Sequence, residues 1–289
     1  MFWVADRKAV SLAAMPPPLQ NAFESFAAVI VTGGSSGIGK SFIGVLHTLN
    51  PDLCFCNLSR RSPGIKSAGL KLCHHAIDLA EPMAVAGALP VILAWLQREV
   101  PAGKVLLINN SGFGGYGYFP APSATHQAGM IDLNVRAVVE LTAGLLPVLK
   151  QRGGAIINVA STAAFQPTAY MSVYGATKAF VLHWSLALDQ EIRREGVPVL
   201  ALCPGPTATE FFRRAGLQPG SVADALSMDS ETVVMTALAA LTKGRAVVVT
   251  GWKNKLGAAL VTKLPKTWAA WLAARVLARF RLKQAGGGA

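Results

Sequence analysis

Short apolar runs alternate along most of the chain with longer segments of helical periodicity. Runs rich in Val, Ile and Leu predict buried strands over residues 27–32, 53–58, 72–77, 105–108, 155–159, 197–202 and 246–250. Apolar residues recur at helical spacing over residues 40–49, 83–96, 130–149 and 172–192. This alternation predicts an α/β fold in which one doubly wound parallel sheet is covered by helices on both faces.

Two terminal segments lie outside the alternation. Residues 1–26 precede the first predicted strand, and the prolines at 16–18 predict a stiff, non-helical spacer. Met15 is an alternative to Met1 as the native start. We therefore predict an N-terminal extension over 1–26, one domain over 27–252 and a basic C-terminal tail over 253–289.

Composition and charge exclude several classes of protein. The 289 residues are 52% hydrophobic and 15% charged, which is typical of a folded domain with a sizeable core. The net charge is +12, but ten Lys and Arg and no acidic residue follow residue 242, which leaves 17 basic against 15 acidic residues elsewhere. Because the excess belongs to the tail, we do not predict nucleic-acid binding.

Cysteine usage and hydropathy bear on the compartment. No CxxC pair occurs, and the apolar surroundings of the cysteines predict buried, reduced thiols and no metal site. These cysteines are Cys54, Cys56, Cys73 and Cys203. Charged residues at 6–8 interrupt the first apolar stretch, unlike in a secretory signal, and no run of about 18 uncharged apolar residues predicts a spanning helix. We expect a cytoplasmic protein.

The tail leaves two interpretations open. Trp268 and Trp271 stand among its basic residues, and its apolar and basic faces are not cleanly separated on a helix. Peripheral contact with an anionic membrane surface is one interpretation. Packing of the tail on the domain or on a partner subunit is the other.

A glycine-rich turn follows the first predicted strand and precedes the first long helix. A strand, a glycine turn and a helix in this order let the backbone approach a pyrophosphate, which the helix N-terminus then faces. The spacing is G-x-x-x-G-x-G, and a glycine turn without a ligand is the alternative. The predicted cofactor-binding residues of the turn are Gly33, Ser35, Ser36, Gly37, Ile38 and Gly39.

The end of the second predicted strand bears on the choice of cofactor. It carries Ser59, Arg60 and Arg61, and no acidic residue lies between Asp52 and Asp78. A carboxylate at this place binds the ribose hydroxyl of NAD, whereas an arginine accommodates the 2′-phosphate of NADP. We therefore predict NADP(H) over NAD(H), with a solvated basic turn as the alternative.

Tyr174 and Lys178 lie four residues apart in a predicted helix, so their side chains share one face. A nearby ammonium group favours the phenolate and lowers the pKa of a phenol. Ser161 follows the strand over 155–159, at the sheet edge where open α/β sheets place ligands. These residues predict a site for acid–base chemistry.

Six motifs in order resemble those of the short-chain dehydrogenase/reductases over residues 27–251. They are Thr32–Gly39 for TGxxxGIG, Asp78–Leu79, Asn109–Gly112 for NNAG with serine in place of alanine, Asn134 in an NVxG-like segment, Ser161 with Tyr174 and Lys178 for S…YxxxK, and Pro204–Thr209 for PGxxxT. The resemblance implies a single Rossmann-type sheet of about seven strands in the order 3-2-1-4-5-6-7.

The resemblance also implies an enzyme and roles for its residues. Tyr174 would protonate the substrate carbonyl oxygen, Lys178 would lower the Tyr174 pKa and hold the nicotinamide ribose, Ser161 would position the carbonyl, and Asn134 would hold a proton-supplying water chain. Further cofactor contacts are implied for Asp78, Leu79, Asn110, Ser111, Gly112, Pro204, Gly205, Thr207 and Thr209. For the two threonines, capping of the following helix is the alternative to a cofactor contact.

Aromatic residues near these motifs indicate the substrate. An apolar or bulky ketone, ketoacyl or steroid-like, is expected to lie on Ser161 between Phe113, Phe165, Tyr170, Phe211 and Phe212. The predicted function is NADP(H)-dependent interconversion of a small-molecule carbonyl and an alcohol. A non-catalytic NADP-binding regulator or scaffold is the alternative, and the family resemblance implies a homodimer or homotetramer.

Overall fold

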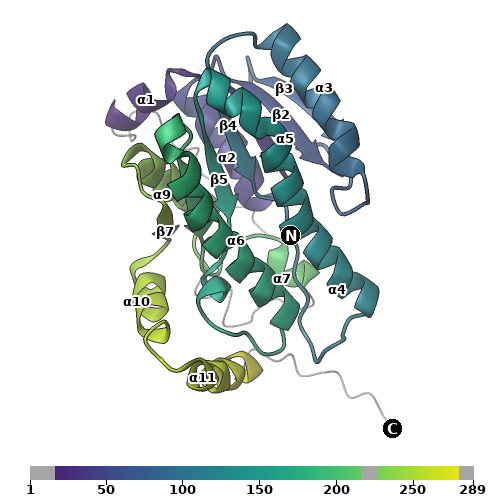
Figure 1. Cartoon of the computed structure of the whole chain (residues 1–289), viewed down its shortest axis with the longest axis vertical. Helices are drawn as coiled ribbons and strands as arrows, with labels where there is room; N and C mark the ends of the chain where they lie inside the picture. The colour runs from purple at the N-terminus through teal and green to yellow at the C-terminus, as the bar shows by residue number, and fades with distance from the viewer. Residues whose placement is uncertain (1–16, 216–226, 280–289) are drawn as a thin grey trace, which may run out of the picture.

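The computed structural model describes residues 17–215 and 227–279, which form a parallel sheet between two layers of helices (Figure 1). The seven strands have the order β3-β2-β1-β4-β5-β6-β7, as predicted. They are β1 Phe26–Thr32, β2 Cys54–Ser59, β3 Lys71–Ala76, β4 Lys104–Asn109, β5 Gly154–Val159, β6 Val199–Cys203 and β7 Val247–Val249.

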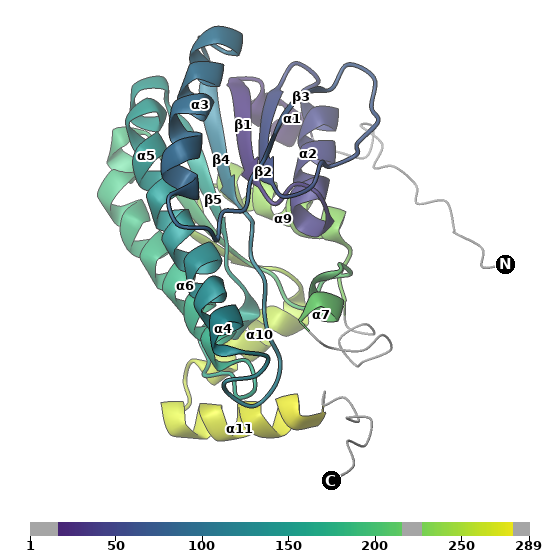
Figure 2. The ribbon, with the colours of Figure 1, turned by 90° about the vertical axis from the view of Figure 1, so that its right-hand side faces the viewer.

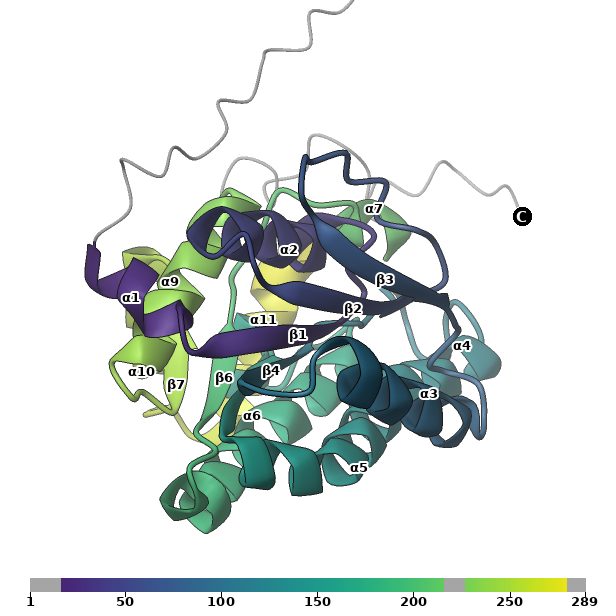
Figure 3. The same ribbon diagram turned by 90° about the horizontal axis from the view of Figure 1, so that it is seen from above.

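The helices divide between the two faces of the sheet, as the view in Figure 3 shows. One face carries α1 (Pro17–Phe23), α2 (Gly37–Leu49) and α9 (Ser230–Thr242). The other carries α3 (Ala84–Glu99), α5 (Ala137–Arg152) and α6 (Ser172–Ile192). Short helices α4 (Ala124–Ile131) and α7 (Phe211–Arg214) lie at the lower end of the molecule in Figure 1.

Both faces of the central strands are buried, which explains their unbroken apolar sequences. In β1, Val29 and Val31 pack in the core under α2 and α9, whereas Ala28 and Ile30 pack in the core under α3 and α5. Every residue of β5 is buried. Covering a strand on both sides removes the polar alternation of a half-exposed strand.

Several elements differ from the sequence prediction, among them α1, α9 and the helix predicted over 130–149. Pro17 and Pro18, predicted as part of a non-helical spacer, are the first two residues of α1. Proline is tolerated in the first helical turn, because the backbone N–H that it lacks would have no intrahelical partner there. Helix α9 was not predicted; its N-cap Asp229 accepts a hydrogen bond from the Thr232 amide at 3.0 Å. The helix predicted over 130–149 begins earlier, in α4, and contains a π-helical turn over Asp132–Arg136.

The carboxyl ends of the strands meet at the end of the molecule that holds α7. Helices α10 (Trp252–Val261) and α11 (Lys266–Arg279) follow β7 and cross this end, with α11 lying beneath the body in Figure 2. Within the described ranges, no helix is long and apolar enough to cross a membrane. The arrangement places the last two helices beside the ligand-binding edge of the sheet.

Candidate active site

A cleft of about 570 Å³ lies at the carboxyl ends of the strands. It extends from the glycine turn before α2, past the ends of β2 and β4, to the first half of α6. Residues of α10 and α11 complete its wall on the outer side. A single cleft therefore joins the predicted cofactor-binding residues to the predicted acid–base group.

The glycine turn is closely packed against the end of β4. Gly33 has φ +70°, and a Cβ atom there would lie 2.9 Å from both Asn110 Nδ2 and Ser111 Oγ. The Thr32 hydroxyl oxygen accepts hydrogen bonds from the amides of Asn110 at 2.9 Å and Ser111 at 2.8 Å. Only glycine fits at position 33 without strain, because the conformation and the space both exclude a side chain.

The amino end of α2 points into the same cleft. Gly37, the first residue of the helix, has φ +55° and lines the cleft together with Ser36. The Ser36 side chain makes no capping hydrogen bond. The first amides of α2 thus provide donors and a positive dipole end for an anionic group.

A buried asparagine connects β2 to the glycine turn. Asn57 Oδ1 accepts a hydrogen bond from the Gly34 amide at 2.9 Å, and Nδ2 donates to Ser59 Oγ at 2.9 Å. Ser59 Oγ in turn donates to the Arg61 carbonyl at 2.7 Å. The Ser59 hydroxyl lines the cleft but is already engaged in holding the turn after β2.

Arginine and aspartate side chains stand together beyond β2. Arg60 Nη1 lies 3.4 Å from Asp78 Oδ2, with the arginine side chain 69% exposed. Asp78 Oδ1 also accepts a hydrogen bond from the Ala80 amide at 3.0 Å, which fixes the carboxylate. Arg60, Arg61 and Asp78 all line the cleft. An exposed guanidinium held beside the cleft can meet a phosphate dianion.

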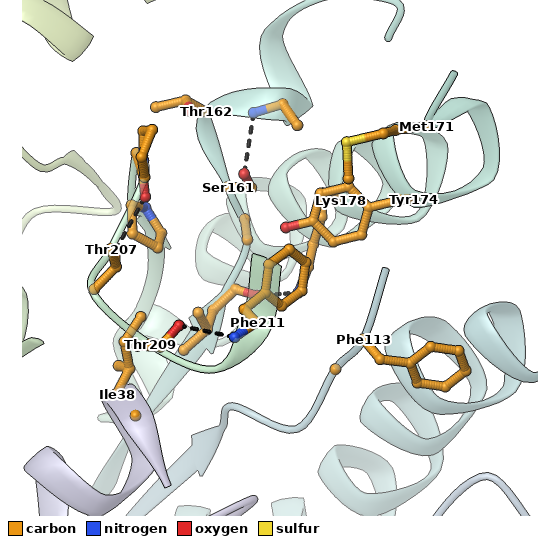
Figure 4. Close-up of a pocket in the computed structure, with 18 of the residues that line it drawn as sticks. Ile38, Phe113, Ser161, Thr162, Met171, Tyr174, Lys178, Thr207, Thr209 and Phe211 are labelled. Atoms are coloured by element: carbon orange, nitrogen blue, oxygen red, sulfur yellow. Dashed lines mark hydrogen bonds between the residues drawn. The ribbon is translucent and has the colours of Figure 1, made fainter. Parts of the chain in front are cut away.

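Ser161 and Tyr174 bring two hydroxyl groups to one point in the cleft, as Figure 4 shows. Ser161 lies two residues after β5 and caps the 3₁₀ turn over Thr162–Phe165, and its Oγ accepts a hydrogen bond from the Ala163 amide at 3.1 Å. The Tyr174 hydroxyl points toward the Ser161 side chain in Figure 4. The pair can therefore present two O–H groups to one carbonyl oxygen.

Lys178 lies one helical turn beyond Tyr174, and both side chains are buried, at 5% and 8% exposure. Lys178 Nζ donates to the Val159 carbonyl at 2.7 Å and lies 6.0 Å from the centre of the Tyr174 ring. The bond to Val159 ties α6 to the end of β5. The ammonium group is thus held near the phenol by a backbone contact.

Burial dominates the electrostatics of this pair. Desolvation raises the pKa of Tyr174 to about 12, although the nearby Ser161 side chain acts in the opposite direction. Desolvation also lowers the pKa of Lys178 to about 8. The net shift of the Tyr174 pKa is thus opposite to the lowering expected from Lys178, because burial of the phenol dominates.

The π-helical turn over Asp132–Arg136 places Asn134 between the loop after β4 and α6. Asn134 Nδ2 donates to the Phe113 carbonyl at 3.0 Å and to Thr177 Oγ1 at 3.1 Å, and Oδ1 accepts from the Phe113 amide at 3.2 Å. Thr177 Oγ1 donates to the Tyr174 carbonyl at 2.7 Å. A Cβ atom on Gly112 would lie 3.0 Å from Asn134 Oδ1 and 3.3 Å from Lys178 Nζ. Asn134 therefore joins the loop after β4 to α6.

The cleft brings together nearly all of the predicted cofactor residues. Those lining it are Gly33, Ser35, Ser36, Gly37, Ile38, Ser59, Arg60, Arg61, Asp78, Leu79, Asn110, Ser111, Gly112, Tyr174, Lys178, Pro204, Gly205, Thr207 and Thr209. Gly39 instead packs inside α2 against Gly33 and Asn110. Thr209 Oγ1 accepts a hydrogen bond from the Phe211 amide at 3.3 Å, the capping role left open for it.

The predicted substrate residues divide into two groups. Phe113 and Phe211 line the cleft, and the Phe211 ring packs 5.2 Å from the Tyr174 ring (Figure 4). Phe165 does not line it and packs against a core cluster between α6 and β6. Tyr170 also lies outside the lining and packs on Tyr118 at 5.3 Å. The side chain of Phe212 lies outside the described part of the chain.

Several residues of the site were not identified from the sequence. Thr32 and Asn57 hold the glycine turn through hydrogen bonds, and Thr177 does the same within α6 next to Tyr174. A polar residue inside an apolar strand, as at Asn57, was the available signal. The tail supplies the largest group that was missed: Lys253, Asn254, Gly257, Ala258, Val261, Ala269, Leu272, Ala273, Val276 and Leu277 all line the cleft.

Comparison with known proteins agrees with this geometry. A family model described as short chain dehydrogenase matches residues 27–219. Serine 3-dehydrogenase of Rhizobium radiobacter is 31% identical over 201 residues, 67% of this chain and 78% of the relative. Ketoacyl reductase HetN of a Nostoc species is 31% identical over 184 residues, 61% of this chain and 62% of the relative. The chain therefore belongs to the short chain dehydrogenase family of oxidoreductases, which act on alcohols and carbonyl compounds.

Solved structures extend the comparison to cofactors. A short-chain dehydrogenase from Sphingobium yanoikuyae in complex with NADPH superimposes with a TM-score of 0.69, is 28% identical and covers 91% of this chain and 99% of its own. A family structure from Burkholderia phymatum in complex with NAD has a TM-score of 0.70 and 20% identity, covering 82% and 92%. The fold thus occurs with either cofactor.

The residues of this chain fit a nicotinamide dinucleotide. Gly33, Gly37 and Gly112 all line the cleft and carry no side chain that would project into it. Arg60 beyond β2 and Tyr174 on α6 line the same cleft. An elongated anionic ligand with a reactive ring would meet backbone donors at the amino end of α2 and polar side chains along the rest of its length.

Proposed function

We propose that this protein is an NADP(H)-dependent oxidoreductase that reduces an apolar or bulky ketone to the alcohol. The neighbouring hydroxyl groups of Ser161 and Tyr174 (Figure 4) carry the proposal, because they lie beside Lys178 in the same cleft as the glycine turn. Catalysis needs a proton donor at the carbonyl oxygen and a cofactor site within reach. Both requirements meet within one cleft.

Tyr174 is the proposed proton donor. Its pKa of about 12 keeps the phenol protonated at neutral pH, so the group is ready to donate when negative charge develops on the carbonyl oxygen. Ser161 accepts from the Ala163 amide and keeps its own O–H for a hydrogen bond to the same oxygen. When bound, the nicotinamide would supply the hydride.

Lys178 and Asn134 are proposed to orient the site and return its proton. Lys178 Nζ already donates to Val159, which leaves further N–H donors for a ribose hydroxyl. Its pKa of about 8 means that the group can exchange a proton near neutral pH. Asn134 fixes the backbone of Phe113 on one side and α6 on the other, and we assign it the support of a water chain to Lys178.

The proposed preference for NADP(H) rests on the end of β2. Arg60 and Arg61 line the cleft where a 2′-phosphate would lie. Asp78, the nearest carboxylate on the neighbouring segment, is paired with Arg60 at 3.4 Å. A phosphate would add a second anionic partner to an exposed guanidinium, whereas a ribose hydroxyl would add only a neutral one.

The proposed substrate class follows from the wall around the hydroxyl pair. Phe113, Met171 and Phe211 pack with Tyr174, and Leu272 and Val276 of α11 line the same cleft. Apolar walls with a few convergent polar groups bind apolar ligands by burial and orient them through hydrogen bonds. A ketoacyl reductase among the relatives accords with such a substrate.

The proposal includes the arrangement of the whole chain. Residues 27–252 form the catalytic domain, residues 1–26 form an extension, and α10 and α11 of the tail cover the cleft. A homo-oligomer is supported by Phe180, which is 41% exposed and stacks on Trp184 at 6.2 Å on the outside of α6. Peripheral membrane contact is supported by the exposed apolar and basic residues of the tail.

Turnover of a ketone panel tests the function. Purified protein is mixed with NADPH or NADH and with ketoacyl thioesters, steroid ketones or small ketones, and the loss of reduced-nicotinamide absorbance is followed. We expect NADPH oxidation with bulky apolar ketones and little with NADH. Tight NADPH binding without turnover of any ketone would favour a non-catalytic NADP-binding regulator instead.

A further inference from the structure

The outer surface of α10 and α11 is apolar, although both helices lie at the surface. We call this surface the end face; its large side chains are 43–71% exposed and belong to Trp252, Leu256, Leu260, Trp268, Trp271, Leu272 and Val276. The opposite sides of the helices are alanine-rich, with Ala258, Ala269 and Ala273 buried. The two helices therefore place small residues inward and large apolar residues outward, the reverse of an ordinary surface helix.

Exposed positive charges accompany the end face on the same two helices and the turn between them. They belong to Lys253, Lys255, Lys263, Lys266 and Arg275, and none of these five forms an ion pair with another described residue. The Arg275 guanidinium lies 3.8 Å from the centre of the Trp271 ring, so part of its stem covers apolar surface. From residue 243 to the end, the chain has ten basic and no acidic residues.

The same helices form a wall of the cleft. Ala269, Ala273 and Leu277 line it from α11, and the Tyr116 hydroxyl donates to the Leu277 carbonyl at 2.8 Å, which ties α11 to the loop after β4. Figure 2 shows α11 crossing beneath the body. Leu272 and Val276 are exposed on the end face and also line the cleft, so the cleft reaches the edge of this surface.

We propose that the end face docks on an anionic lipid bilayer and that the apolar ketone enters the cleft from the lipid at the edge of α11. Tryptophan is favoured at the boundary between water and acyl chains, while lysine and arginine reach the headgroups. Each cation near an anionic surface strengthens binding by a factor of about five. The docking proposal depends only on the residues of the end face, whereas the proposed entry of substrate also rests on the proposed function.

A lipid surface explains the charges better than a second copy of the chain does. A two-fold interface pairs a surface with itself, so the basic residues that accompany one end face would meet the same basic residues of the other. Like charges brought together across an interface disfavour association. An anionic bilayer complements both the apolar side chains and the basic residues that accompany them.

Vesicle sedimentation with the full chain tests the docking. The protein is mixed with vesicles of phosphatidylcholine and phosphatidylglycerol, or of phosphatidylcholine alone, and the bound fraction is measured after centrifugation. The variant Lys255→Gln/Lys263→Gln/Lys266→Gln should bind the anionic vesicles roughly 100-fold more weakly. The matched control carries the same charge change at the other end of the sheet: Lys71→Gln/Lys104→Gln/Lys150→Gln.

The anionic vesicles should pellet the wild type and the control triple variant, and the neutral vesicles should pellet neither. Trp268→Ser/Trp271→Ser should also release the protein, because it removes the apolar anchor while both positions are exposed. No pelleting of the wild type, or equal binding by the two triple variants, would overturn the docking. Thermal melts of all variants show whether each one is folded.

Reduction of a long-chain ketone carried in the vesicles tests the entry of substrate. The tail triple variant should lose the rate on this ketone relative to the control triple, and both should reduce a water-soluble ketone equally. Equal rates on the vesicle-borne ketone would overturn the entry from lipid. Wild type that binds vesicles but reduces neither ketone would overturn the proposed function and leave the docking standing.

Discussion

Replacing Tyr174 by phenylalanine removes a single hydroxyl group from the site. The ring packs against Met130, Met171 and Phe211, and these contacts survive the change. Loss of the hydroxyl should change the free energy of unfolding by no more than about 1 kcal/mol. The variant should therefore fold and bind NADPH as the wild type does.

The effect on turnover should be far larger than the effect on stability. With a pKa of about 12, Tyr174 is the protonated donor throughout the neutral range, and no other acid in the pair can give a proton to the developing oxyanion. General acid catalysis contributes roughly 10²- to 10⁴-fold, and a hydrogen-bond donor at an oxyanion roughly 10²- to 10³-fold. Because Ser161 remains as a donor, we expect kcat to fall roughly 10³-fold.

Steady-state NADPH oxidation with a ketone substrate measures the loss, and fluorescence titration with NADPH checks that binding is kept. Tyr170→Phe is the matched control, since it makes the same chemical change four residues away, on a ring that lies outside the cleft and packs on Tyr118. Turnover by Tyr174→Phe at the wild-type rate would refute Tyr174 as the acid. Equal losses in the two variants would point to packing as the cause.

Three further predictions concern the cofactor, the buried lysine and the size of the cleft. Arg60→Ala should raise KM for NADPH roughly 10- to 100-fold and leave KM for NADH almost unchanged, because a charge-assisted contact to a 2′-phosphate is lost; equal changes for both cofactors would argue against that contact. Burial lowers the pKa of Lys178 from 10.5 to about 8, so between these values the unfolded chain holds a proton that the folded chain lacks and stability rises with pH. The free energy of unfolding of the wild type minus that of Lys178→Met should thus rise by about 3 kcal/mol from pH 8 to 10.5 in urea titrations, and a constant difference would contradict the depressed pKa. Ala273→Phe, which fills the cleft from α11, should lower kcat/KM for bulky ketones and spare small ones in the same NADPH assay; a uniform loss would place Ala273 outside the substrate path.

The arrangement of strands and the positions of Ser161, Tyr174 and Lys178 could be predicted from the sequence because each has a local signal. Strands buried on both faces are unbroken apolar runs, and polar residues directly after them lie at the carboxyl edge of a parallel sheet. The glycine turn at Gly33 could also be predicted, because it lies between an apolar run and a helical segment. In the structure, its conformation and its contacts leave no room for a side chain. Local patterns were sufficient for these features.

The position of the tail could not be predicted, because it depends on what the tail packs against. Ala269 and Ala273 fit the wall of the cleft, but alanines four apart on a helix give no sign of the partner surface. The π-helical turn that positions Asn134 could not be predicted either, because a single π turn does not change the helical periodicity of the sequence enough to be recognised. These features arise from contacts between segments distant in sequence.

The pKa of Tyr174 shows a different limit. A lysine one turn away predicts a lowered phenol pKa, and the spacing was correct. Burial reverses the result, since both groups lose contact with water, and the extent of burial follows from the packing of α6 against the loops after β4 and β5. Sequence spacing identifies such a pair, whereas the fold determines its electrostatics.

Transfer of deuterium from labelled NADPH tests the central proposal most directly. The wild type is incubated with NADPH that carries two deuterium atoms at the reacting carbon and with a bulky apolar ketone, and the alcohol is analysed by mass spectrometry. The proposed function predicts alcohol containing one deuterium from the wild type and almost none from Tyr174→Phe. Wild-type protein that binds the cofactor and transfers no deuterium to any ketone of the panel would contradict it.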